Sequence, residues 1–113
     1  MPQANHVHSE GNTRTLRIDG KFDFKLHRCF RELYEQAPPE IARYVIDLAR
    51  TEYMDSSALG MLLLLREHVG GERQSVQIVN CRPEIRRLLE RANVDTLFEF
   101  RWAHASVAAQ LGG

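Results

Sequence analysis

The stretch VIDLARTEYMDSSALGMLLLL, residues 45–65, decides the fold because it joins a buried strand to a helix. Its first residues continue an apolar run from Tyr44 that does not alternate with polar residues. Such a run is typical of a strand covered on both faces, and we predict a strand over residues 44–48. Three polar residues that favour helix starts, Asp55, Ser56 and Ser57, precede a helix that we predict over residues 57–69. Gly70-Gly71 ends it.

Elements of the same two kinds flank this stretch. Residues 15–22 alternate, with Leu16, Ile18 and Phe22 on one face, which predicts a half-buried strand. Apolar residues at helical spacing predict a helix over residues 24–37, which Pro38-Pro39 would end. Further elements are predicted as follows: a partner strand at residues 6–8 across a turn at Gly11-Asn12, a strand at 75–79, a helix at 83–92, a short strand at 97–100 and a last helical turn after Ser106.

Strands that alternate with helices of this length require crossover connections and a largely parallel sheet. We therefore expect one small α/β domain over residues 1–113, with a mixed, mostly parallel sheet of about four to five strands and about four helices. Residues 1–5 are expected to form a disordered tail.

Composition excludes several classes of function. The 113 residues contain 15 basic and 15 acidic side chains, so no general field attracts nucleic acid or an anionic membrane. The longest apolar run, residues 61–65, is too short to span a bilayer. Cys29 and Cys81 lie far apart and form no disulfide framework, which is typical of reduced thiols in the cytoplasm. We expect a cytoplasmic protein without nucleic-acid or membrane partners.

The polar triplet before the second helix has two interpretations. The first is helix capping, in which Asp or Ser satisfies backbone N–H groups of the first turn. One cap residue suffices, however, and no Glu or Gln at position 59 or 60 completes a capping box. The second interpretation is a phosphorylation site, since the free amides and dipole of a helix start favour an anion.

The sequence resembles a known family, the bacterial anti-sigma factor antagonists of the STAS domain (sulfate transporter and anti-sigma factor antagonist). The resemblance covers residues 15–111. It rests on Gly20-Lys21-Phe22-Asp23, on the more specific segment Met54-Asp55-Ser56-Ser57-Ala58-Leu59-Gly60, and on Val79-Asn80 leading to Ile85, Leu88 and Leu89. Ala58 stands where the family more commonly has glycine.

The resemblance implies a switch protein and not an enzyme. Its unphosphorylated form would bind an anti-sigma factor with serine kinase activity and release the sigma factor, and a serine phosphatase would reset it. By the resemblance, Ser57 is the modified residue, with Ser56 as the alternative. The partner surface would include Asp23, Asp55, Ser56 and Gly60. No cofactor or metal is implied, and the free protein is expected to be a monomer.

The second helix carries more apolar residues than one inward stripe requires. Ala58, Met61, Leu62, Leu65 and Val69 complete such a stripe, which leaves Leu59, Leu63 and Leu64 on its flanks and outer side. One interpretation is that these leucines pack on neighbouring helices. The other is a docking patch next to the serines, for which Met61 and Leu64 are the candidates.

Other functions find less support in the sequence. A serine hydrolase with Ser57 as nucleophile lacks the G-x-S-x-G spacing, and neither GxGxxG nor a P-loop is present for a nucleotide. His6-x-His8 has no carboxylate or cysteine cluster near it in the sequence to complete a metal site. Arg82, Arg86, Arg87 and Arg91 are interrupted by Glu84 and Glu90, which favours a solvated, internally paired helix face. A STAS module with an output in biofilm, motility or stress signalling, or a scaffold that is never phosphorylated, remains an alternative.

Overall fold

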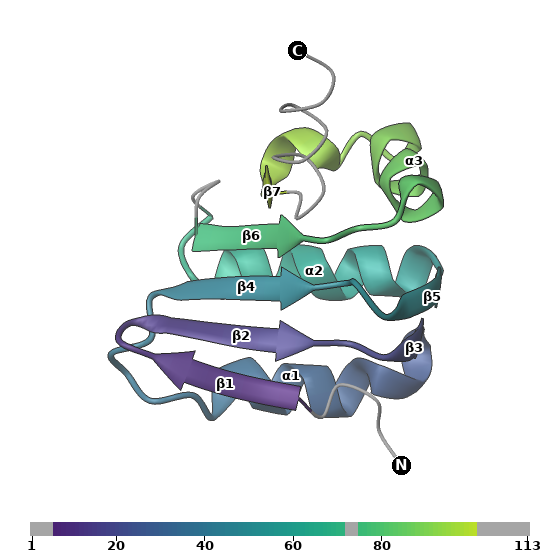
Figure 1. Cartoon of the computed structure of the whole chain (residues 1–113). Coiled ribbons are helices and arrows are strands. Elements are labelled where there is room, and N and C mark those ends of the chain that lie inside the picture. Colours follow the sequence, from purple (N-terminus) through teal and green to yellow (C-terminus); the bar gives the residue numbers. More distant parts are fainter. Residues whose placement is uncertain (1–5, 72–74, 102–113) are drawn as a thin grey trace, which may run out of the picture.

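The computed structural model describes residues 6–71 and 75–101 (Figure 1) and follows the predicted order of strands and helices, except that the strand predicted over residues 15–22 is divided in two and that an additional strand lies at Thr51–Met54. Its strands are β1 (His6–Glu10), β2 (Thr13–Arg17), β3 (Gly20–Phe22), β4 (Arg43–Asp47), β5 (Thr51–Met54), β6 (Val76–Val79) and β7 (Glu99–Arg101). Its α-helices are α1 (His27–Glu35), α2 (Ser56–His68) and α3 (Pro83–Arg91), with 3-10 helices η1 (Phe24–Leu26) and η3 (Asp95–Leu97). The helical turn predicted after Ser106 lies outside the described residues.

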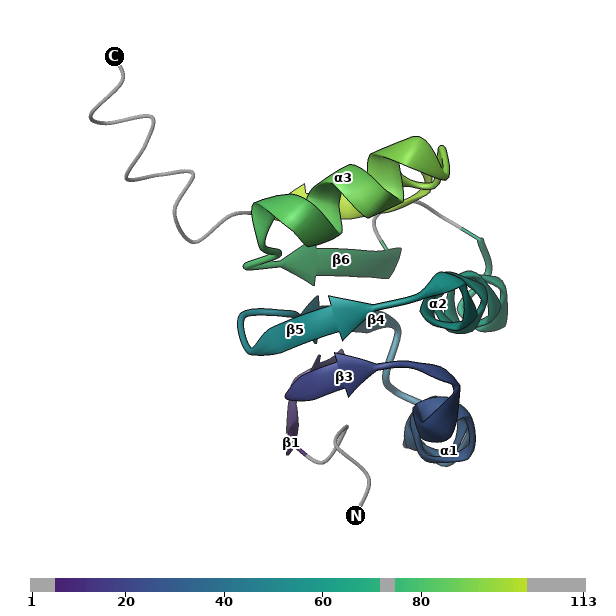
Figure 2. The ribbon, with the colours of Figure 1, turned by 90° about the vertical axis from the view of Figure 1, so that its right-hand side faces the viewer.

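The main sheet has five strands in the order β1-β2-β4-β6-β7. β1 pairs antiparallel with β2 as a hairpin, and every later neighbour is parallel, which confirms the mixed, mostly parallel sheet. Each crossover moves the chain one strand further in the same direction. Because such crossovers are right-handed, their helices fall on one face of the sheet. Figure 2 shows α1 and α2 together on that face.

The strand predicted over residues 15–22 is in fact two strands in two sheets. β2 belongs to the main sheet, whereas β3 pairs with β5 in a separate two-stranded sheet. β5 was not predicted from the sequence. The break falls at Gly20, which has a φ of +80° and a register shift beside it. Two hydrogen bonds fix the new pairing: Gly20 N donates to Arg50 O at 2.9 Å, and Thr51 Oγ1 donates to Ile18 O at 2.7 Å.

The core lies between the sheet and the helices and confirms the alternating pattern. Leu16 of β2, Phe22 of β3 and Ile18 between the two strands are all fully buried. From α2, Leu62 and Leu65 are fully buried against them. The predicted helix at 24–37 is shorter than expected: it begins as the 3-10 turn η1, and α1 ends at Glu35. Both cysteines are free thiols, as predicted.

Candidate functional site

The ends of β3 and β5 bring two distant parts of the sequence together. The strands run parallel with Phe22 opposite Met54, and Asp55 N donates to Phe22 O at 3.4 Å. The residues that follow this pair are Asp23 and Asp55, so both predicted carboxylates lie at the same edge, where the neighbouring ends of β3 and β5 can be followed in Figure 2. From this edge, the segment after β3 enters η1 and α1, and the segment after β5 enters α2.

Both carboxylates act as helix caps. Asp23 Oδ1 accepts a hydrogen bond from Lys25 N at 3.0 Å, and Asp55 Oδ1 accepts one from Ala58 N at 3.3 Å. These bonds satisfy backbone donors that the first turn leaves free. Since Asp55 is the cap of α2, Ser56 and Ser57 are the first two residues of the helix, and both are exposed. The capping interpretation is correct for Asp55, and the serines remain available.

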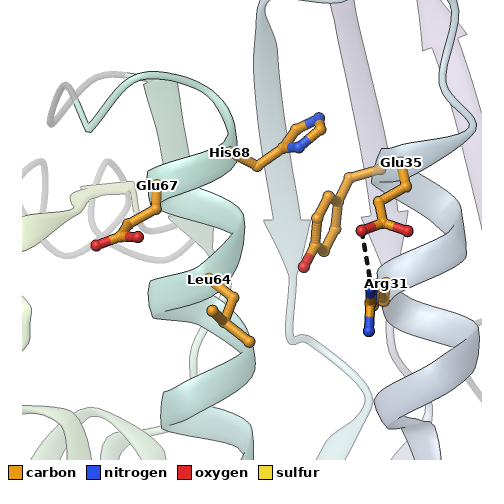
Figure 3. Close-up of a pocket in the computed structure, with 6 residues that line it drawn as sticks. Arg31, Glu35, Leu64, Glu67 and His68 are labelled. Atoms are coloured by element: carbon orange, nitrogen blue, oxygen red, sulfur yellow. Dashed lines mark hydrogen bonds and ion pairs between the residues drawn. The ribbon is translucent and has the colours of Figure 1, made fainter.

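The two serines face different directions. Successive residues of an α-helix are about 100° apart, so Ser56 projects roughly opposite the fully buried Ala58. It shares this outward face with Gly60 and Glu67, which are also exposed. Ser57 lies seven residues before Leu64 and therefore on the same side of the helix, and Figure 3 shows Leu64 facing α1. The two exposed hydroxyls thus lie on different sides of α2.

The other predicted partner residues differ in how much of each side chain is exposed. Leu64 is 50% exposed and Gly60 is exposed, as a docking surface requires. Met61 is only 3% exposed, so its assignment to a surface patch is wrong, because its position on the inward stripe places it in the core. Asp23 is 9% exposed and occupied with its cap, so little of its side chain reaches the surface. Leu59 and Leu63 are half-buried against the core.

Two exposed aromatic residues beside the motif were missed from the sequence. Phe24, which follows Asp23, is 65% exposed, and Tyr53, two residues before Asp55, is 49% exposed. Tyr53 lies in β5, opposite Lys21 of β3, and the failure to predict β5 concealed it. The exposure of Phe24 could have been predicted, because Phe24 does not lie on the inward apolar stripe of the helix predicted over residues 24–37, which starts at Leu26. Together they place exposed apolar surface on both sides of the two caps, Phe24 just after Asp23 in η1 and Tyr53 just before Asp55 in β5.

Several charged groups away from this edge form ion pairs with each other. His6 Nε2 and Arg17 Nε both lie 3.1 Å from the carboxylate of Asp19. Burial alone would raise the pKa of Asp19, but the hydrogen bond from Arg17 and the surrounding positive charges hold it below its ordinary value. On α3, Arg86 Nε contacts Glu90 Oε2 at 3.0 Å, which confirms the internally paired helix face.

Among residues 6–71 and 75–101, no group of three or more His, Cys, Asp or Glu side chains is arranged to hold a metal ion. Within the same residues, no helix has the length and apolar character needed to cross a membrane.

Comparisons with known proteins agree with the fold described above. The family profile described as "Mlab, STAS domain" matches residues 5–99. A STAS-domain containing protein of Pseudomonas aeruginosa (strain UCBPP-PA14) is 47% identical over 91 residues, which cover 80% of this chain and 90% of the relative.

Two solved structures share the fold at low sequence identity. The anti-sigma factor antagonist SpoIIAA in its unphosphorylated form is 15% identical with a TM-score of 0.65, and the match covers 96% of this chain and 97% of that one. An anti-sigma factor antagonist from Mycobacterium paratuberculosis is 22% identical with a TM-score of 0.70, covering 94% and 90%. The chain belongs to the STAS domain family, whose members are regulatory domains and not enzymes.

Proposed function

We propose that this protein is an anti-sigma factor antagonist controlled by phosphorylation of its Asp-Ser-Ser motif. The unphosphorylated form binds an anti-sigma factor that has serine kinase activity, and the sigma factor is released. Phosphorylation of Ser57 or Ser56 abolishes binding, and a serine phosphatase restores the active form.

The exposed serine pair at the start of α2 is the observation that carries this proposal. Asp55 caps the helix without help from the serines, so a modified hydroxyl costs no capping bond. A phosphate at either position also lies where the helix dipole favours a negative charge, a contribution of up to about 2 kcal/mol. The helix therefore remains folded after modification, and the change is confined to the surface.

The expected effect of phosphate on a partner is electrostatic. It adds a charge of about −1.5 to −2 beside Asp55, and a partner covering this edge must desolvate that charge. Changing the occupancy of a complex from about 99% to about 1% requires roughly 5.5 kcal/mol. A buried, unpaired phosphate supplies an effect of this size without any refolding of the domain.

The surface around the serines suits protein binding. Phe24 and Tyr53 offer exposed aromatic area, and aromatic side chains are enriched among residues that dominate interface energies. We include Gly60 and Asp55 in the same surface, because both lie within about one helical turn of the serines. Leu64 lies further along the helix on the side of Ser57.

The test uses the purified anti-sigma factor kinases of the source organism. The protein is incubated with each kinase and ATP, and the modified residue is mapped by mass spectrometry in the wild type, Ser56→Ala and Ser57→Ala. Affinity is then measured by calorimetry for Ser56→Asp and Ser57→Asp. We expect the alanine variant at the true site to bind normally and resist modification, and the aspartate variant there to bind at least tenfold more weakly.

Asn12→Asp is the matched control, since it adds the same charge at the exposed hairpin turn between β1 and β2. It is expected to bind as the wild type does. The proposal is wrong if no kinase modifies either serine and both aspartate variants keep wild-type affinity. A modified serine on a protein that binds a kinase with no sigma factor under its control would instead indicate another signalling output.

A further inference from the structure

A groove between α1 and α2 lies beyond the serine motif. It has a volume of about 450 Å³ and is lined by three residues of each helix: Arg31, Tyr34, Glu35, Leu64, Glu67 and His68. Figure 3 shows that Leu64 and His68 point from α2 towards α1, whereas Glu67 points away from α1 and borders the groove only at its edge. The lining positions recur at three- and four-residue spacing on both helices, so the groove runs along the helix axes.

The walls of the groove are already ordered. Arg31 Nε contacts Glu35 Oε2 at 2.9 Å on α1, and the rings of Tyr34 and His68 lie 4.9 Å apart, joining the two helices. Tyr34 is only 5% exposed and packs edge-on against the fully buried Phe30. A partner would therefore meet a preformed surface and would not have to order these side chains on binding.

Leu64 and Glu67 give the groove its chemical character. Leu64 is the large apolar residue in the lining that is exposed, at 50%. Arg31 and Glu35 neutralise each other. Glu67 forms no ion pair with any residue in the part of the chain that the structure describes. The groove thus combines the apolar area of Leu64 with the carboxylate of Glu67 at its edge.

We infer that this groove is a docking site for an amphipathic helix of the same kinase partner, and the inference rests on the proposed function. A straight groove between two helices fits a third helix, whose apolar side chains at three- and four-residue spacing would cover Leu64. A Lys or Arg flanking that apolar face would pair with Glu67. This charge complementarity selects a basic amphipathic helix over an acidic one.

The groove continues the surface that carries the switch. Ser57 and Leu64 are two helical turns apart on one side of α2, a rise of about 10 Å. One partner can therefore cover both. The groove would supply affinity that does not depend on phosphorylation, and the serine pair would supply the switch.

The test measures the affinity of the kinase partner identified above for Leu64→Ala and Glu67→Lys. We expect about a fivefold loss for Leu64→Ala. For Glu67→Lys we expect a loss of about tenfold, which shrinks at high salt. The matched controls are Val7→Ala, at another exposed aliphatic residue, and Glu84→Lys, at an exposed acid on α3, and both should bind normally. Circular dichroism checks that all four variants are folded.

The outcomes separate the groove from the switch. If the groove variants bind within twofold of the wild type while the serine-to-aspartate variants lose binding, the groove inference is overturned and the proposed function stands. If only the groove variants lose binding, the docking site is supported and the switch is overturned. If the wild type sediments as a dimer that Leu64→Ala dissociates, the occupant is a second copy of this chain and the inference is overturned.

Discussion

Helix α2 follows β5 of the two-stranded sheet and α3 follows β6 of the main sheet, and the two helices use their surfaces differently. α3 buries Ile85 and Leu89 on one side and carries the Arg86–Glu90 ion pair on the other. α2 buries Leu62 and Leu65 but also carries leucines around the rest of its circumference. α2 has neighbours on both flanks: α1 across the groove, and η3 through a hydrogen bond from Arg66 Nε to Leu97 O at 3.0 Å.

The N-terminal ends of the two helices also differ. α2 begins with a side-chain cap and two exposed hydroxyls, whereas α3 begins at Pro83 with no side-chain cap, after the buried thiol of Cys81. The first residues of both helices are exposed, but only the start of α2 presents hydroxyl groups that could carry a regulatory group. The modifiable side chain nearest the start of α3, the thiol of Cys81, is buried.

The largest expected contrast is in the reactivity of thiols placed at the two starts. Burial raises the pKa of Cys81 to about 12, so its unreactive thiol form persists far above neutral pH. An exposed thiol has a pKa of about 8.5, and at about pH 8 its thiolate fraction exceeds that of Cys81 by roughly a thousandfold. In a Cys29→Ser background, Ser57→Cys should therefore react with a disulfide reagent at least about tenfold faster than Cys81, because the higher nucleophilicity of the Cys81 thiolate offsets only part of the difference in thiolate fraction. Comparable rates in the folded protein would show that the thiol of Cys81 is accessible.

The next contrast is between two leucines of α2. Leu62 is fully buried, so Leu62→Ala should lower the free energy of unfolding by about 2–5 kcal/mol through lost contacts and a cavity. Leu64 is half exposed, and Leu64→Ala should cost less than about 1 kcal/mol. Urea denaturation of both variants measures the difference. A loss above about 2 kcal/mol for Leu64→Ala would assign that residue to the core and remove the basis of the groove inference.

The smallest contrast concerns the caps. Asp55→Ala removes the hydrogen bond to Ala58 N and should cost about 1 kcal/mol, within the range of about 0.5–2 kcal/mol for lost caps. Arg82 occupies the equivalent position before α3 but makes no side-chain cap bond, so Arg82→Ala should change stability by less than about 0.5 kcal/mol. Thermal and urea unfolding check both values. Equal losses would mean that Asp55 contributes nothing special to the start of α2.

Much of the burial pattern was predictable from local sequence patterns. The alternation of Leu16, Ile18 and Phe22 correctly predicted burial, because side-chain period in an extended chain does not depend on which sheet it joins. The same pattern could not show that Ile18 lies between two strands. The chain changes sheets at Gly20, and the pairing of β3 with β5 is made by residues far away in the sequence. The helical spacing of Met61 correctly placed it on the inward stripe of α2. Its additional assignment to the surface patch conflicted with that spacing and was wrong.

Local sequence patterns were enough to predict most of the elements, the inward residues and the family motif, because these depend on period, turn residues and the spacing of a few side chains. Three facts required the packed structure: Asp23 and Asp55 share one edge, Phe24 and Tyr53 are exposed beside them, and Leu64 faces a groove. These facts arise from strand pairing and helix packing, which join residues distant in the chain. No local pattern carries that information.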